Sequence, residues 1–341
     1  MSQPSLPPES PTPADARPAA PVAPTAATAP AAPSAPLGTA PLGTAPSGIA
    51  PDSGVIHNIG YRSYTGPRLG RSYATRSLYV QSLRAAYGLG RSGKSKVLPM
   101  LMLGLPVLVA AMIVVIAIIK GGTELPTDYP QFLNTVGLLV EIFLAAQAPV
   151  LLSRDLRHNT VPLYFSRPIT RGDYVRAKFA AMVTAMMLVM VAPLLVLYLG
   201  SILAGQGLAH NTGHFLIGLV AALLYAALYS AIGLLIAAST PRRGFGVAAI
   251  MGVLVVSGIL AGIVFGLSGG LHGDPPASAN WAAVISPSML VDGFVNQLFG
   301  LVTDPRVTHA PGAFGAVAFA VEILAVTAAC YWLVDRRYRK I

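Results

Sequence analysis

The sequence has few charged residues and only one cysteine. Asp, Glu, Lys and Arg make up 11% of its 341 residues, whereas a soluble globular domain carries about 25%. The mean hydropathy of +0.64 agrees with this deficit, which excludes a soluble globular protein and predicts an integral membrane protein. Cys330 lies within an apolar run, so no intrachain disulfide can form. We expect no signal peptide, because the sequence does not show a charged segment followed by an apolar segment and a cleavage site.

The sequence also lacks a catalytic constellation such as a Ser-His-Asp set, a carboxylate dyad or a cysteine cluster. Gly88 to Ser95, GLGRSGKS, fits the pattern of a phosphate-binding loop. That motif needs a strand before it and a helix after it in an α/β domain, whereas here a predicted helix precedes it and a membrane span follows. Leu267 to Gly270, LSGG, matches the start of a nucleotide-binding signature but lies on the predicted outer side. We therefore expect no ATP hydrolysis and no cofactor on this chain.

Two histidines, His210 and His214, stand four residues apart in a predicted outer loop. That spacing can hold a metal when the segment is helical. Asn211, Thr212 and Gly213 between them favour a turn, so we interpret both as solvated loop histidines and expect no metal site.

The chain before the spans divides into two segments. Residues 1–55 contain 14 of the 29 prolines, and we expect a disordered Pro/Ala-rich tail. Residues 56–96 are basic and carry Tyr79, Leu83 and Tyr87 on one helical face. This second segment predicts a cytoplasmic amphipathic helix in the lipid headgroup plane. A nucleic-acid-binding arm is the alternative, and the adjacent membrane span argues against it.

Six apolar runs follow, each long enough to cross the roughly 30 Å hydrocarbon core of a bilayer at about 1.5 Å per residue. They are residues 97–119, 132–152, 179–204, 215–238, 245–267 and 313–334. The predicted fold class is therefore an all-α integral membrane protein with six transmembrane helices.

Basic residues fix the orientation of the spans. With the N-terminus inside, Lys120 and Arg306 are the only ones of 23 lysines and arginines that fall in outer loops. Such asymmetry places both termini in the cytoplasm. It also explains the net charge of +10 without a nucleic-acid partner. The outer connection 268–312 contains a half-apolar stretch with Pro287 and Asp292, which predicts an interfacial or re-entrant helix pair rather than a seventh span.

The cytoplasmic loop 153–178 combines charge, an apolar patch and a helix start. Thr170 and Asp173 match a capping box before the third span. We interpret the loop as a folded surface for a cytoplasmic partner, and the alternative is a charged loop that only fixes topology. The residues that we assign to this surface are Arg154, Asp155, Arg157, Leu163, Tyr164, Phe165, Arg167, Thr170, Arg171 and Asp173.

Glu141 and Glu322 are the acids within the six runs. Each lies roughly 13.5 Å past the outer start of its span, near the bilayer midplane, where a lipid-facing charge costs on the order of 3 kcal/mol. They either bond two helices together as neutral acids, with Gln147 among the possible partners, or line a translocation path. We take Glu141, Gln147 and Glu322 as path candidates.

Three glycines in the fifth run, Gly258, Gly262 and Gly266, stand four residues apart. Small residues at this spacing let membrane helices approach closely. They predict helix packing, either within one subunit or across a dimer.

Two blocks of the sequence resemble the permease subunits of ABC-2 type transporters. They are LSRDLRHNTVPLYFSRPITRGDYVRAKF, residues Leu152 to Phe179, and ISPSMLVDGFVNQLFG, residues Ile285 to Gly300. Asn159 stands where the family usually has Gly, and Ala177 precedes Lys178, but the layout of the loop is the same. The resemblance covers residues from about 56 to 341 and assigns residues 97–341 to a six-span permease domain.

The resemblance implies an exporter subunit that forms the translocation path. It also implies that the 153–178 loop seats on a separate cytoplasmic ATPase, which holds ATP and Mg²⁺, and that a second permease half, identical or related, completes the path. The expected location is a bacterial cell membrane, in contact with lipid. An ion-coupled secondary transporter and a non-transporting anchor or sensor are the alternative functions.

Overall fold

The computed structural model describes residues 65–66, 69–90, 92–121, 125–157, 160–166, 168–240, 242–270, 276–301 and 308–340. The predicted tail, residues 1–55, lies outside these ranges. The described residues from Thr65 onward belong to one compact unit. Within them every regular element is helical, which confirms the all-α prediction.

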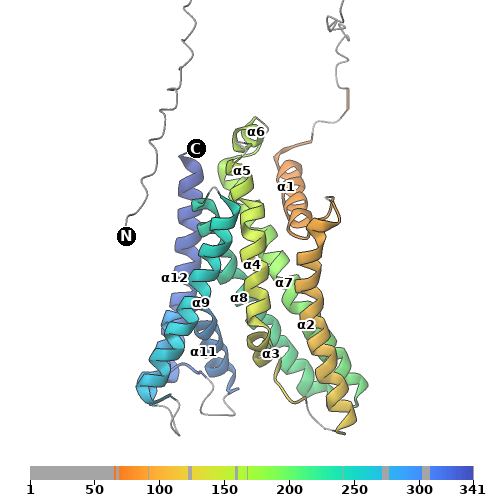
Figure 1. The fold of residues 1–341 in the computed structure, drawn as a ribbon, viewed down its shortest axis with the longest axis vertical. Helices are drawn as coiled ribbons and strands as arrows, with labels where there is room; N and C mark the ends of the chain where they lie inside the picture. Colours follow the sequence, from red (N-terminus) through yellow and green to blue (C-terminus); the bar gives the residue numbers. More distant parts are fainter. Residues whose placement is uncertain are drawn as a thin grey trace, which may run out of the picture. The chain divides into compact units, whose positions relative to one another are not determined.

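Six helical segments of the described chain are long and apolar enough to cross a membrane, as predicted (Figure 1). They are α2 (Lys94–Ile119), α4 (Gly137–Leu151) continued by α5 (Ser153–Arg157), α7 (Arg171–Leu203), α8 (Leu208–Ser239), α9 (Arg243–Phe265) continued by the π-helical η1 (Gly266–Gly270), and α12 (Gly312–Arg339). The second predicted run, 132–152, is interrupted. Helix α3 (Tyr129–Thr135) ends at Thr135, and Val136 separates it from α4.

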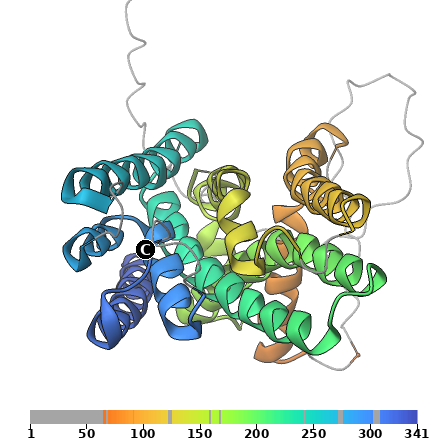
Figure 2. The ribbon, with the colours of Figure 1, turned by 90° about the horizontal axis from the view of Figure 1, so that it is seen from below.

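Helices α4, α7 and α8 form the centre of this unit, and Figure 2 shows α2 and α9 on its periphery. The central helices contribute fully buried side chains such as Phe143, Met186 and Tyr229. By contrast, α2, α9 and α12 turn large apolar side chains outward, among them Leu108, Ile259 and Leu324. Outward apolar faces are expected where helices meet lipid or another membrane subunit.

The outer connection folds into α10 (Ala277–Asn280), η2 (Trp281–Ile285) and α11 (Pro287–Phe299). Helix α11 packs against α8, α9 and α12. Pro287 occupies the first turn of α11, where its missing N–H leaves no bond broken. Asp292 is buried because α11 is inserted between the other helices on the outer side.

Helix α1 (Arg71–Ala86) runs alongside the first turns of α7. Tyr79 donates to Thr184 Oγ1 at 3.0 Å, and Tyr87 donates to the Ala185 carbonyl at 2.8 Å. The aromatic face predicted to lie in the headgroup plane therefore contacts protein. The physical reason is that both phenol hydroxyls find partners on α7.

The turn prediction for His210 and His214 is wrong, because α8 begins at Leu208 and both histidines are helical. Their rings lie 4.2 Å apart between centroids. The Asn211 side chain donates to the Gly207 carbonyl at 3.0 Å and accepts from Tyr129 at 3.3 Å. These bonds stabilise the first turn of α8 and override the turn preference of the local sequence.

The phosphate-loop match at residues 88–95 follows α1, a helix rather than a strand, and its last two residues are the first two of α2. Gly88 has φ +66°, and a Cβ added there would lie 2.5 Å from the Ser95 carbonyl oxygen. Only glycine satisfies both constraints.

Gly88→Ala should therefore lower the stability of the purified chain by about 1 to 3 kcal/mol, since it strains the backbone and displaces Ser95. Thermal unfolding in detergent measures the change. Gly104→Ala in α2 is the matched control, because Gly104 is helical and has open space around the Cβ position. Equal melting temperatures for both variants would contradict this account of the turn.

Candidate functional site

The predicted partner surface is a folded segment at the same end of the unit as the C-terminus (Figure 1). It comprises α5 and α6 (Val161–Phe165), and α7 begins at Arg171. Residues 158–159 and Arg167, which was assigned to this surface, lie outside the described residues. Arg154, Arg157 and Leu163 are exposed, and 67% of Leu163 is open to solvent. Thr170 and Arg171 are exposed as well, so these side chains contribute to the outward surface of the segment.

An ion pair is buried beneath this surface. Lys178 Nζ of α7 lies 2.8 Å from Asp155 Oδ2 of α5, and the side chains are only 7% and 4% exposed. The Tyr174 hydroxyl donates to the same carboxylate oxygen at 2.9 Å. A buried charge pair needs such additional hydrogen bonds to offset its desolvation. Asp155, assigned to the partner surface, therefore faces inward and fastens α5 to α7.

Aromatic side chains attach α6 in the same way. The rings of Tyr164 and Phe165 lie 5.5 and 6.2 Å from that of Tyr174, and Tyr338 of α12 lies 5.1 Å from Tyr174 on another side. The Arg171 guanidinium stands 5.7 Å over the Phe165 ring. Tyr164 and Phe165 of the predicted apolar patch thus face the helices, and Leu163 is its exposed residue.

The predicted capping box is confirmed at the start of α7. Thr170 Oγ1 accepts from the Asp173 N–H at 3.3 Å, and the Asp173 carboxylate accepts from the Thr170 N–H at 3.2 Å. The same carboxylate pairs with Arg71 Nε of α1 at 2.5 Å and with Arg176. Asp173 therefore joins the capped end of the loop to α1 and is not part of the outward surface.

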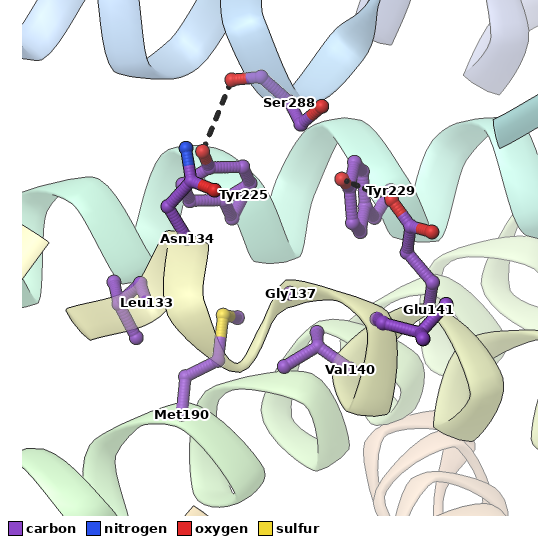
Figure 3. Close-up of a pocket in the computed structure, with 10 residues that line it drawn as sticks. Leu133, Asn134, Gly137, Val140, Glu141, Met190, Tyr225, Tyr229 and Ser288 are labelled. Atoms are coloured by element: carbon purple, nitrogen blue, oxygen red, sulfur yellow. Dashed lines mark hydrogen bonds between the residues drawn. The ribbon is translucent and has the colours of Figure 1, made fainter. Parts of the chain in front are cut away.

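A second candidate site is a cavity of ≈ 130 Å³ inside the span region (Figure 3). It is bounded by α3, α4, α7, α8 and α11. Its lining residues are Leu133, Asn134, Gly137, Leu138, Val140, Glu141, Met190, Tyr225, Tyr229 and Ser288.

Hydrogen-bonded polar groups surround this cavity. Tyr229 donates to Glu141 Oε1 at 3.0 Å, and Tyr225 donates to Asp292 Oδ1 at 2.6 Å and to the Ser288 carbonyl at 3.0 Å. The Asn134 amide donates to Asp292 Oδ2. Burial raises the pKa of Asp292 to about 6, although the bonds from Tyr225 and Asn134 oppose the rise. The cavity wall is thus rich in oxygen atoms, and no Lys or Arg lines it.

The three path candidates lie in different surroundings. Glu141 lines the cavity, Gln147 is buried further along α4, and Glu322 is half-buried on α12 outside the cavity lining. The sequence interpretation missed Tyr225, Tyr229 and Asp292. Two tyrosines four residues apart within an apolar span were the available signal, because their hydroxyls require partners there.

The glycines of α9 lie beside the outer connection. A Cβ at Gly258 would meet Ser286 Oγ at 3.9 Å, and one at Gly262 would meet Met289 Cε at 4.0 Å. Both are ordinary contact distances, and Gly266 opens η1. Closer helix approaches occur at Gly200, where a Cβ would lie 2.4 Å from Val114, and at Gly233, where it would lie 2.8 Å from Leu144.

Six apolar helices in the described part of the chain are long enough to span a bilayer and define a multi-pass membrane protein. A profile of the family described as ABC-2 family transporter protein matches residues 138–338, from α4 to α12. The chain belongs to this family and is the membrane permease of an ABC transporter. No curated protein matches the chain.

Removing one member of the buried ion pair should destabilise the protein more than removing both. Lys178→Met leaves Asp155 buried without its counter-charge, which costs about 3 to 5 kcal/mol. Adding Asp155→Leu should recover part of that loss, because no uncompensated charge then remains. Thermal unfolding of the purified chain compares the variants.

Arg154→Met provides the control, since Arg154 is exposed on the same helix as Asp155. If Lys178→Met melts like Arg154→Met, the ion pair does not hold α5 on α7.

Proposed function

We propose that this permease is an export subunit that couples to a separate cytoplasmic ATPase through α5 and α6. The observation that carries the proposal is that Leu163, Arg154 and Arg157 are all exposed on α5 and α6, and that a buried ion pair fastens α5 to α7. Protein interfaces combine an apolar core with a polar rim, and this segment offers side chains of both kinds. ATP and Mg²⁺ then belong to the partner, and this chain carries no cofactor.

The fastening of α5 gives the partner a mechanical connection to the spans. Lys178 links α5 to α7, and Ser153 donates to the Ala237 carbonyl of α8 at 2.8 Å. Movement of α5 therefore moves the cytoplasmic ends of α7 and α8. The same two helices contribute Met190, Tyr225 and Tyr229 to the cavity.

We assign the cavity around Glu141 to the cargo path. Its position among the central helices and its hydrogen-bonding oxygens support this assignment, because polar groups are retained within spans mainly where they bind or transport. The apolar walls formed by Leu133, Leu138 and Val140 favour a hydrophobic or amphipathic cargo.

A second permease half, identical or related, completes the path in this proposal. The apolar faces of α2, α9 and α12 offer surface both to that half and to lipid. The expected location is the plasma membrane of a bacterium, with the basic surface toward the cytoplasm.

Leu163→Asp should weaken ATPase binding by about 2 kcal/mol or more, roughly 30-fold in Kd, because it places a charge at the centre of the interface. Co-purification with the ATPase and binding titration measure the loss. The change removes no basic residue, so it leaves the topology signal intact.

Leu89→Asp is the matched control, since Leu89 is also exposed and lies in the connection between α1 and α2, outside the 153–178 loop. Unchanged ATPase binding by Leu163→Asp would remove α6 from the interface.

If Glu141 lines the path, a cysteine at position 141 should react with a small cationic thiol reagent. Its rate should change severalfold when the ATPase is trapped with vanadate, because the cavity then opens to the other side. The background is Cys330→Ala, and Leu144→Cys is the buried control. Glu322→Cys tests the remaining acid in the same way.

Glu141→Gln and Glu141→Leu separate a path role from a packing role. A packing residue tolerates Gln, which keeps the bond from Tyr229, and loses folded protein with Leu. A path residue loses transport in both variants while the yield stays intact. If the cysteines at positions 141 and 322 are both unreactive, with and without vanadate, neither acid lines the path.

A further inference from the structure

A groove of ≈ 610 Å³ lies between α1 and α7 at the cytoplasmic end of the unit, beside the capped start of α7. Three arginines line it: Arg71 and Arg76 from α1, and Arg176 from α7. Ser72, Thr75 and Tyr79 also line its α1 wall. The Thr75 and Tyr79 hydroxyls already donate to the Arg71 carbonyl and to Thr184, so the groove presents mainly guanidinium donors, which suit a phosphate group.

The charge of the groove is not balanced by its own acid. Asp173 pairs with Arg71 and Arg176, and it also accepts from the Thr170 hydroxyl at 2.8 Å. Its carboxylate oxygens are thus occupied, and the lining keeps two positive charges in excess. Arg76 forms no ion pair among the described residues. The Arg71 and Arg176 side chains remain 55% and 63% exposed, so they can reach a ligand without leaving Asp173.

The floor of the groove continues along α7 through Thr184, whose hydroxyl is already bonded to the Ala180 carbonyl and to Tyr79, toward Leu188. Ala180 of α7 lies in the groove and is exposed, and Leu188 further along α7 is 47% exposed. Arg176, Ala180 and Leu188 fall at multiples of four residues, on one face of the helix. A ligand seated on the arginines would therefore lay any attached chain along α7 toward the membrane interior.

We propose that this groove binds an anionic phospholipid of the inner leaflet, with its phosphate on Arg71, Arg76 and Arg176 and its acyl chain along Ala180 and Leu188. The positive-inside asymmetry places the groove at the cytoplasmic surface, where anionic lipids attract basic residues. A soluble phosphate ester has the same phosphate chemistry as the headgroup, but it has no acyl chain to pack along Ala180 and Leu188.

Because Arg71 also donates to Thr170 Oγ1 at 3.0 Å, the bound lipid sits directly against the capped end of the 153–178 loop.

Native mass spectrometry of the full chain, with phosphatidylglycerol and with phosphatidylcholine, tests the site. The wild-type chain should retain phosphatidylglycerol selectively. Arg76→Gln with Arg176→Gln should weaken that binding about five-fold for each arginine removed. Arg84→Gln with Arg337→Gln removes the same charge from exposed positions outside both the groove and the partner surface and should leave the selectivity unchanged.

Arg76→Lys with Arg176→Lys keeps the charge and should retain most of the lipid binding. This variant replaces the Gln variant in the test if the Gln variant folds poorly. Equal losses in the groove variant and the Arg84/Arg337 control would overturn the proposal in favour of general surface charge. Full displacement of the lipid by an equal concentration of glycerol 3-phosphate would also overturn it, because the site would then bind soluble phosphate esters. Retained selectivity in both groove variants would show that the arginines do not bind the headgroup.

Discussion

The ion pair between Lys178 and Asp155 holds the cytoplasmic end of the molecule together. Neither charge contacts water appreciably, so their attraction must offset a desolvation free energy of several kcal/mol for each ion. The Tyr174 hydroxyl contributes a second donor to Asp155, and the Tyr174 ring lies 5.3 Å from the ammonium. The charges therefore hold α5 in one position relative to α7. A hydrophobic pair of similar volume would fix that position less strictly, because apolar contacts lack direction.

Local patterns in the sequence predicted the features that neighbouring residues determine. The six spans follow from apolar runs of sufficient length, and the capping box at Thr170 and Asp173 follows from a three-residue spacing. The folded state of the cytoplasmic loop is indicated by the same kind of local signal. These features depend on hydropathy and on helix geometry, which tertiary contacts do not override here.

Contacts between distant residues could not be predicted in this way. Tyr229 and Glu141 are 88 positions apart, and Tyr225 and Asp292 are 67 apart. Their meeting depends on how α4, α8 and α11 pack, and one sequence does not show that packing. The inward position of Asp155 could not be predicted for a related reason. A charged residue in a loop is expected to be exposed to solvent unless its partner on another helix is known. His210 and His214 show the opposite error, in which a local turn preference was given more weight than the continuing helix.

The two candidate sites are connected through the helices that they share. Helix α5 follows α4 directly through Leu152, contacts α7 through the ion pair and contacts α8 through Ser153. One five-residue helix thus touches the cytoplasmic ends of all three central helices. The cavity lies between the same three helices near Glu141, Met190 and Tyr229. Packed helices shift as rigid bodies rather than deform continuously, so a displacement of α5 that moves these helices relative to one another would alter the distances across the cavity. The Tyr229 bond to Glu141 joins α8 to α4 at the cavity, so a relative shift of those two helices would change its length.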